Sequence, residues 1–208
     1  MKGHRSVQVY LLGIVGVTIG PQCALSDEVN PKNATIEIVA CRVDGVQIGK
    51  RFDQFRAKWG DPQSVVRGSA SRPMSRVTEE LTYQALGTTF LTEKGVLKLA
   101  DIGLPDPGDV SQLRFSPELT STMKRDEVLA ALGTPAGDVR GRDMSYLVYR
   151  EEQCCVVIDV GRRDTILGIG LIAYDTVGDV WRSEPDNLAA CGDGAARSGP
   201  VGGRDRQK

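Results

Sequence analysis

Histidine is almost absent from this chain of 208 residues: the single one is His4, and aromatic side chains make up only 5% of the sequence. His4 lies in an amino-terminal segment that we expect to be removed, so the mature chain is predicted to have no imidazole. Catalytic Ser-His-Asp and Cys-His arrangements need an imidazole to move a proton near neutral pH. The sequence therefore excludes both mechanisms.

An excess of charge of either sign is also lacking. The 26 Lys and Arg residues are balanced by 27 Asp and Glu residues, for a formal net charge of -1. Proteins that bind nucleic acids draw most of their affinity from clustered basic residues, so a nucleic-acid partner is not predicted. The cysteines do not have the spacing of a tetrahedral zinc site, and the sequence predicts neither a metal nor a cofactor.

Residues 1–26 have the pattern of a secretory signal peptide. Lys2 and Arg5 precede an apolar run, and no acidic residue occurs before Asp27. The run is shorter than the roughly 20 residues that span a bilayer, and a small-x-small triplet at 24–26 supplies a cleavage site. We expect a mature chain that begins at Asp27, has no stable transmembrane segment and is periplasmic or secreted.

Two alternatives remain for this segment. One is an uncleaved amino-terminal anchor. The other is lipid attachment at Cys23, which would make the protein an outer-membrane lipoprotein. The residues at 20–22 depart from the usual lipobox of Leu followed by two small residues, so lipidation is the lesser alternative.

Four cysteines follow the signal segment, namely Cys41, Cys154, Cys155 and Cys191. An even number in an exported chain predicts two disulfides. A bond between the adjacent Cys154 and Cys155 is disfavoured, because neighbouring strand residues point to opposite faces. We expect Cys191 to tie the tail to the strand that carries Cys154 and Cys155, and either of them could be its partner.

Two stretches of the chain are alike: GKRFDQFRAKWGDP at 49–62 and TMKRDEVLAALGTP at 122–135. Apolar residues recur in each at helical spacing, which predicts a short amphipathic helix with one packed face. Gly60 and Gly133 then favour a left-handed residue at the helix end, and a proline two positions later prevents continuation.

Three β-rich runs follow each helix, and a further strand is indicated before each. The fold class predicted is α+β: two tandem repeats, each a short helical segment packed on a three- or four-stranded antiparallel sheet. The boundary is placed near Asp106, in a Gly- and Pro-rich linker. The predicted organisation is a signal peptide at 1–26, repeats at 27–105 and 106–183, and a mostly disordered tail at 184–208. The six runs are 79–84, 88–91, 96–102, 144–150, 154–160 and 165–173, and the further strands are 35–40 and 112–115.

The segment at 122–135, followed by an aromatic strand and a hairpin, resembles the repeat shared by the SmpA/OmlA (BamE-like) outer-membrane lipoproteins and the secreted β-lactamase-inhibitor proteins. The resemblance covers about 50 residues in each copy. It implies a helical segment on a small antiparallel sheet that works by binding other proteins, and two tandem copies are more similar to the inhibitor.

Four residues are candidates for binding a partner: Tyr83, Tyr146, Tyr149 and Arg150. Tyrosine and arginine are common in interface hot spots. Alternation along the strand at 144–150 places Tyr146 and Arg150 on one face and Tyr149 on the other, where it would cover the helix. The alternative is that the tyrosines are partly buried and Arg150 is merely solvated.

Other motifs predict structure rather than chemistry. Gly168 and Gly170 match the spacing of a dinucleotide fingerprint, but they lie inside a β-rich run with no helix after it, so a bulge or close packing is expected. Phe55 and Trp59, at helical spacing, are predicted to lie in the core. The acidic pairs at 79–80 and at 159 and 164 could be proposed for glycoside chemistry, but exposed strand and turn acids are the better account.

The sequence thus predicts a non-catalytic, exported module of the bacterial envelope whose sheet face binds another envelope or secreted protein. Inhibition of an envelope enzyme is one role, and outer-membrane assembly or envelope maintenance is another. The alternative from a different class is a hydrolase or transferase that uses only carboxylates, Ser or Tyr.

Overall fold

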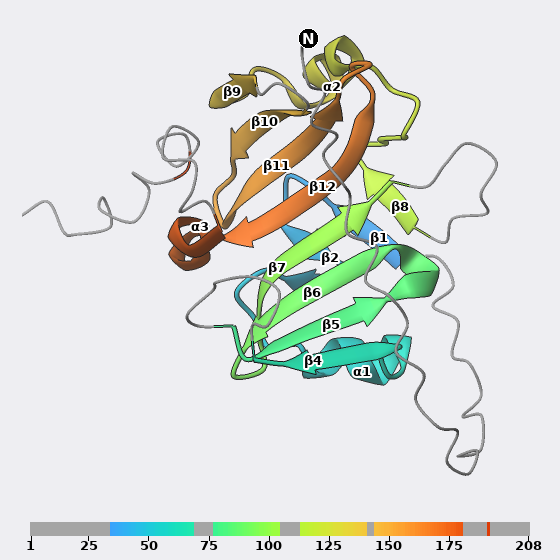
Figure 1. Ribbon diagram of the computed structural model, residues 1–208, viewed down its shortest axis with the longest axis vertical. Coiled ribbons are helices and arrows are strands. Elements are labelled where there is room, and N and C mark those ends of the chain that lie inside the picture. The colour runs from blue at the N-terminus through green and yellow to red at the C-terminus, as the bar shows by residue number, and fades with distance from the viewer. Residues whose placement is uncertain (1–33, 69–76, 105–112, 141–143, 181–190, 192–208) are drawn as a thin grey trace, which may run out of the picture.

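A single eight-stranded antiparallel sheet forms the centre of the molecule (Figure 1). The computed structural model describes residues 34–68, 77–104, 113–140, 144–180 and 191. No helix among them is long and apolar enough to cross a membrane. In spatial order the strands are β4 (Ser64–Arg67), β5 (Glu79–Tyr83), β6 (Thr88–Glu93), β7 (Val96–Gly103), β12 (Ile166–Ala173), β11 (Cys154–Gly161), β10 (Met144–Arg150) and β9 (Gly137–Arg140).

The expected α+β arrangement of two helix-on-sheet repeats with separate sheets is wrong. β7 pairs with β12 over five residue pairs, from Gly103 opposite Gly168 to Leu99 opposite Ile172, and this pairing makes one sheet of both halves. Strand residues far outnumber helical ones, so the protein is mostly β. The physical reason lies mainly in β12, which is apolar on both faces, as central strands are, and which pairs with the largely buried strand β7.

A second, four-stranded sheet packs on one face of the large one, in the order β3-β2-β1-β8. β1 and β8 are the strands expected ahead of each helix. Instead of extending two separate sheets, they pair with each other in parallel, from Ala34 opposite Leu113 to Glu37 opposite Ser116. The bounds are β1 (Ala34–Glu37), β2 (Arg42–Val43), β3 (Val46–Gln47) and β8 (Leu113–Ser116).

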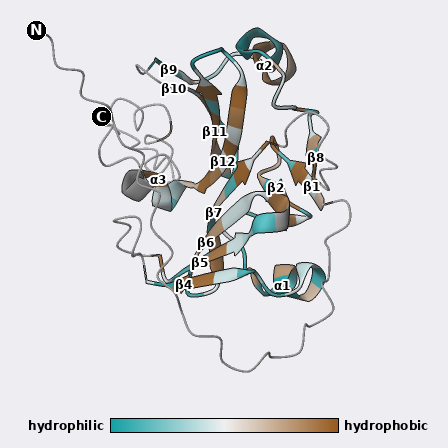
Figure 2. Cartoon of the chain, turned by 45° about the vertical axis from the view of Figure 1, so that its right-hand side comes forward, coloured by the Kyte–Doolittle hydropathy of each residue, from teal (hydrophilic) through white to brown (hydrophobic). Residues whose placement is uncertain are grey.

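The helices α1 (Asp53–Trp59) and α2 (Arg125–Leu132) cover the same face as the small sheet, while α3 (Tyr174–Val180) lies on the opposite face (Figure 2). A 3-10 helix, η1 (Gln84–Leu86), joins β5 to β6. Phe55 and Trp59 are buried as predicted, and both rings contact Phe90 of β6. The Trp59 indole donates a hydrogen bond of 2.7 Å to Asp44 in the β2–β3 turn, which ties α1 to the small sheet.

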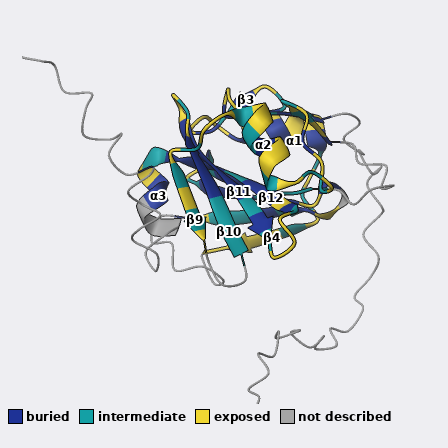
Figure 3. Ribbon diagram, turned by 90° about the horizontal axis from the view of Figure 1, so that it is seen from above, coloured by how far each residue is buried: buried dark blue, intermediate teal, exposed yellow. Residues whose placement is uncertain are grey.

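Helices α1 and α2 each bury one side and expose the other (Figure 3). Each ends at a glycine with positive φ, 73° at Gly60 and 82° at Gly133. Their ψ values of -165° and -160° place them in a region that essentially only glycine adopts, rather than in the left-handed helical region that we expected. The main-chain conformation at each helix end therefore requires glycine.

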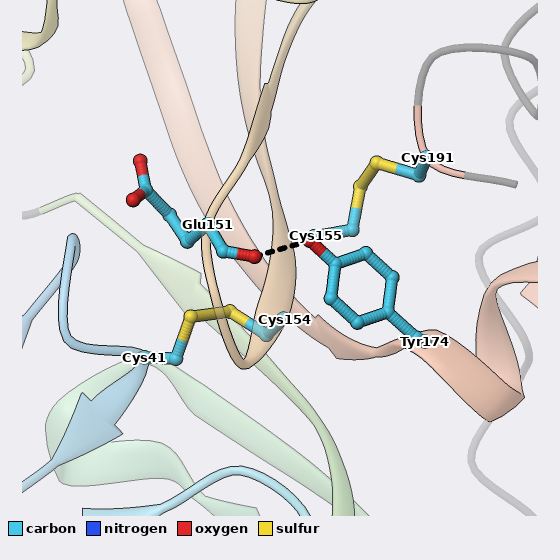
Figure 4. Close-up of a disulfide and its surroundings, with 6 residues drawn as sticks. All are labelled: Cys41, Glu151, Cys154, Cys155, Tyr174 and Cys191. Atoms are coloured by element: carbon cyan, nitrogen blue, oxygen red, sulfur yellow. Dashed lines mark hydrogen bonds between the residues drawn. A yellow bond between two sulfur atoms is a disulfide. The ribbon is translucent and has the colours of Figure 1, made fainter. Parts of the chain in front are cut away.

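Two disulfides join strand β11 to other parts of the chain (Figure 4). Cys154 bonds to Cys41 at the end of the small sheet, and Cys155 bonds to Cys191; each pair has a Cα–Cα distance of 5.9 Å. The expectation of two bridges without a Cys154–Cys155 bond is confirmed. The sequence left the partner of Cys191 open, and the structure assigns it to Cys155.

Several predictions on the chain's organisation fall outside the described residues. These are the signal segment at 1–26 with Cys23, the boundary at Asp106, and all of the tail at 184–208 except Cys191. The first and second segments of the predicted domain plan, 27–105 and 106–183, meet in the undescribed stretch 105–112.

Replacing Gly133 by Val should lower the free energy of unfolding by about 1–3 kcal/mol, because a β-branched residue strongly disfavours this backbone conformation. A Cβ at Gly133 would meet no atom within 4 Å, so Gly133→Ala should cost nearly as much as Gly133→Val. Urea unfolding of both variants tests this, with Thr134→Val at the next, exposed position as the control. A tolerated Ala would contradict the account.

Removing the Cys41–Cys154 bridge should destabilise the fold more than removing Cys155–Cys191. The two bridges close loops with sequence separations of 113 and 36 residues, and the longer loop restricts the unfolded chain by about 1 kcal/mol more. Urea unfolding of the two Cys-to-Ala double variants measures the difference. Equal or reversed losses would show that local packing, and not loop closure, sets the contribution of each bridge.

Candidate functional site on the open sheet face

The two faces of the large sheet differ in how they are covered. The face that carries α1, α2 and the small sheet forms the larger core. On the opposite face, a smaller apolar cluster lies under α3 and Cys191, and it includes Leu91, Leu99 and Ile172. The rest of that opposite face has partly exposed residues, and we call it the open face.

A straight row of short, mostly polar residues crosses the open face. Strand register places five residues side by side on five neighbouring strands, from β4 to β12. All five are half-buried, whereas Leu81, Phe90 and Ala100, which alternate with them onto the other face, are buried. Side chains directly opposite one another on adjacent strands share a face, so their hydroxyl and carboxylate groups form one surface. The five are Ser64, Thr82, Thr89, Asp101 and Gly170.

The next row along the open face is rich in glycine. Gly103 of β7 lies opposite Gly168 of β12. A Cβ at Gly168 would come within 3.2 Å of the Ile102 carbonyl oxygen, which fits the expected close packing. The expected bulge is also present, because the β11–β12 register shifts beside Asp159. The two strands at the sheet centre therefore carry no side chains at these positions.

Tyr146 and Arg150 flank this surface on β10. Tyr146 pairs with Asp159 of β11 in the same row as Gly168, is half-buried, and packs beside the smaller apolar cluster. Arg150 is exposed two rows away on the same face. The predicted alternation along β10 is thus confirmed, with Tyr146 and Arg150 on the open face and Tyr149 on the other.

Tyr83 and Tyr149, the other two binding candidates, lie in the core and have only 1% and 4% of their surface exposed. Each closes a helix end: the Tyr83 hydroxyl donates to the Gly60 carbonyl (3.1 Å), and the Tyr149 hydroxyl to the Gly133 carbonyl (3.4 Å). Burial raises the pKa of both tyrosines to about 12, because it penalises the charged phenolate. Neither side chain is accessible to a partner. The prediction that Tyr83 and Tyr149 bind a partner is therefore corrected, and both tyrosines have a structural role.

Carboxylates are present on the open face, but the described part of the chain contains no group of His, Cys, Asp and Glu residues that could hold a metal ion. Asp101 on β7 and Asp159 on β11 lie on either side of β12, on the same face. Burial raises the pKa of Glu151, which lies in the β10–β11 connection, where its carbonyl accepts a hydrogen bond from Tyr174 (Figure 4).

The row on the open face was missed by the sequence analysis. Its signal was the alternation of Thr82 and Thr89 with apolar residues on their strands, but only the strand register brings them beside Asp101. The short strands β2 and β3, the outermost strands β4 and β9 and helix α3 were also missed.

Comparisons with known proteins assign this chain to no family. No protein-family model matches the sequence. No curated protein matches it either. Solved structures with a partly similar chain path include a DUF4309 family protein from Bacillus subtilis, with 13% identity, a TM-score of 0.44, and coverage of 63% of this chain and 84% of that one.

Two further structures have the same kind of likeness. An extracellular protein containing an SCP domain from Bacillus anthracis has 14% identity, a TM-score of 0.41 and coverage of 65% of this chain. A cysteine-rich secretory protein from Staphylococcus aureus has 9% identity, a TM-score of 0.44 and coverage of 64%. This chain spans 46% of the length of each of these two proteins. The resemblance to SmpA/OmlA lipoproteins and β-lactamase-inhibitor proteins stays a hypothesis from the sequence.

Replacing Tyr83 and Tyr149 by Phe should lower the free energy of unfolding by about 1 kcal/mol each, the usual loss of one hydrogen bond.

The same substitutions should also change how the free energy of unfolding depends on pH. The folded-state pKa of about 12 lies above the ordinary value of 10.0, so stability is fully present below about pH 10 and falls as pH rises toward 12. The variant with both tyrosines replaced by Phe should lose less stability over this pH range than the unsubstituted protein. Urea unfolding at neutral and alkaline pH measures both effects, and an unchanged alkaline slope would contradict the second.

Proposed function

We propose that the protein is an exported, non-catalytic module that binds another envelope or secreted protein through its open face. The observation that carries this proposal is the row of half-buried Ser, Thr and Asp residues across four adjacent strands, which continues to Gly170 on a fifth. Short polar side chains beside a glycine-lined centre form a flat surface with many hydrogen-bonding groups, which suits contact with a protein better than enclosure of a small molecule.

The disulfides support the export part of the proposal. Two bridges persist in oxidising compartments and are rare in the cytosol. Cys41, Cys154 and Cys155 are fully buried, so their bridges are integral to the packed core.

Tyr146 and Arg150 extend the proposed surface toward β10. Both residue types are enriched in interface hot spots, and the two stand on the same face as the polar row. Inhibition of an envelope enzyme fits this surface, and so does a role in envelope assembly. The identity of the captured partner separates the two roles.

A second candidate function rests on Asp101 and Asp159, whose placement on both sides of the glycine-bearing strand β12 allows a carboxylate-based hydrolase or transferase. A substitution at Asp101 distinguishes the two candidate functions. Asp101→Asn retains shape and should preserve protein binding, whereas it should abolish a carboxylate-dependent reaction.

The test is an affinity capture of partner proteins. It compares the disulfide-bonded, unsubstituted protein with the Thr89→Arg variant, which is changed in the middle of the row. A long, charged side chain at Thr89 should abolish capture of a saturable partner by steric clash. Thr134→Arg, at an exposed position after α2 on the other side of the sheet, is the matched control and should leave capture unchanged. Equal capture by all three proteins would overturn the open face as the binding site.

A further inference from the structure

A hollow of about 480 Å³ lies at the other side of the sheet, where α2 begins. Its lining is strongly cationic and comes from three separate parts of the chain: the start of α2, the end of β9, and the turn between β11 and β12. The hydroxyl of Ser145 on β10 adds a neutral hydrogen-bonding group. The four cationic residues of the lining are Lys124, Arg125, Arg140 and Arg163.

Main-chain contacts fix these parts relative to one another. The Arg125 amide donates to the Asp164 carbonyl over 3.0 Å, and the Lys124 ammonium donates to the Arg163 carbonyl over 3.1 Å. The main chains of Lys124 and Thr165 also form an isolated antiparallel β-bridge. The start of α2 is thus joined to the β11–β12 turn, and the cationic side chains are held around one space.

The carboxylates nearby neutralise the cluster only in part. Arg125 and Arg140 share the single carboxylate of Asp138. Glu127 is occupied by the main-chain amide of Lys124, over 2.6 Å. Among the described residues, no ion pair is made by Arg163.

The two carboxylates that line the hollow leave its cationic character in place. Asp126 is 94% exposed and 3.9 Å from Arg125, and Asp164 is also exposed, so water screens both charges. Four cationic groups face two solvated carboxylates, and the space between them favours an anion.

One donor in the lining has no acceptor. The Nε of Arg125 is buried and makes no hydrogen bond, although the same guanidinium contacts Asp138 through another nitrogen. The Arg125 side chain is only 18% exposed. A buried donor without an acceptor costs free energy, so the contact with Asp138 does not satisfy the whole Arg125 guanidinium.

We propose that this hollow binds the phosphate group of a small phosphorylated molecule. A phosphate presents several acceptor oxygens in different directions, which suits guanidinium and ammonium groups that converge from three elements better than a planar carboxylate does. The hollow is larger than one phosphate ion, so part of the attached molecule fits as well. This site is separate from the open face and does not depend on the function proposed there.

The proposal is tested by titrating the isotope-labelled, disulfide-bonded protein with inorganic phosphate, glucose 6-phosphate and citrate while amide NMR signals are followed. We expect saturable shifts at 124–126, 140, 145 and 163–164 with both phosphates, tighter binding of glucose 6-phosphate, and weaker binding of citrate. Binding should weaken as salt is added. Glucose 6-phosphate that binds no better than inorganic phosphate would overturn the attached-molecule part. Citrate that binds as well as phosphate would overturn the phosphate class, and absent or non-saturable shifts would overturn the site.

Substitutions locate the site. Arg163→Gln and Arg140→Gln change exposed side chains, so the fold should survive, and each should weaken phosphate binding about 10-fold through loss of one charged hydrogen bond. Arg67→Gln on β4, at the opposite end of the sheet, removes the same charge from another exposed arginine and should leave binding unchanged. An equal effect of all three variants would show that net charge alone attracts the anion, and would overturn the site.

Discussion

The pairing of β7 with β12 is the interaction on which the rest of the structure depends. It places Ile102 opposite Ile169 and Leu99 opposite Ile172, and these residues belong to the cores on the two faces of the sheet. Without it, each half of the chain would have a four-stranded sheet with an exposed apolar edge, which is prone to aggregation. The open face exists because this pairing brings Asp101 of one half beside Gly170 of the other.

Strand β11 holds the layers together through two adjacent cysteines that point to opposite faces. Cys154 reaches the small sheet through Cys41, and Cys155 reaches Cys191 on the side of α3. Alternation along a strand makes this arrangement natural, since neighbouring residues serve different faces. The same alternation on β10 gives Tyr149 to the core and Arg150 to solvent.

Local features of this fold could be predicted from the sequence, because the periodicity of apolar residues and the Gly-x-Pro helix ends are local signals. Helices α1 and α2, the six principal strands and the separate pairing of Cys154 and Cys155 were found in this way. The joining of the halves could not be predicted, because strand order depends on contacts between distant segments. The apolar character of β12 on both faces was the one hint of a central position.

The candidate site was harder to predict, because it depends on register and burial. Tyrosine in a β-rich run does not reveal whether its ring faces solvent, and Tyr83 and Tyr149 proved to close helix ends. The polar row needs five strands in register before Thr82, Thr89 and Asp101 form one surface. The residues that line the hollow beside α2 are also far apart in the sequence, so no local motif predicts the hollow.

The two proposed sites lie on opposite faces of the sheet, and strand β10 contributes to both. Ser145 points into the hollow beside α2, and its neighbour Tyr146 lies on the open face. A ligand in the hollow therefore does not occupy the surface offered to a protein partner. Because β10 is paired on both sides and its centre is buried, it is a rigid connection, and a ligand that shifted it would have to strain the core. The geometry favours two sites that can be filled at the same time, which would let one exported protein contact a phosphate-bearing component and a protein together.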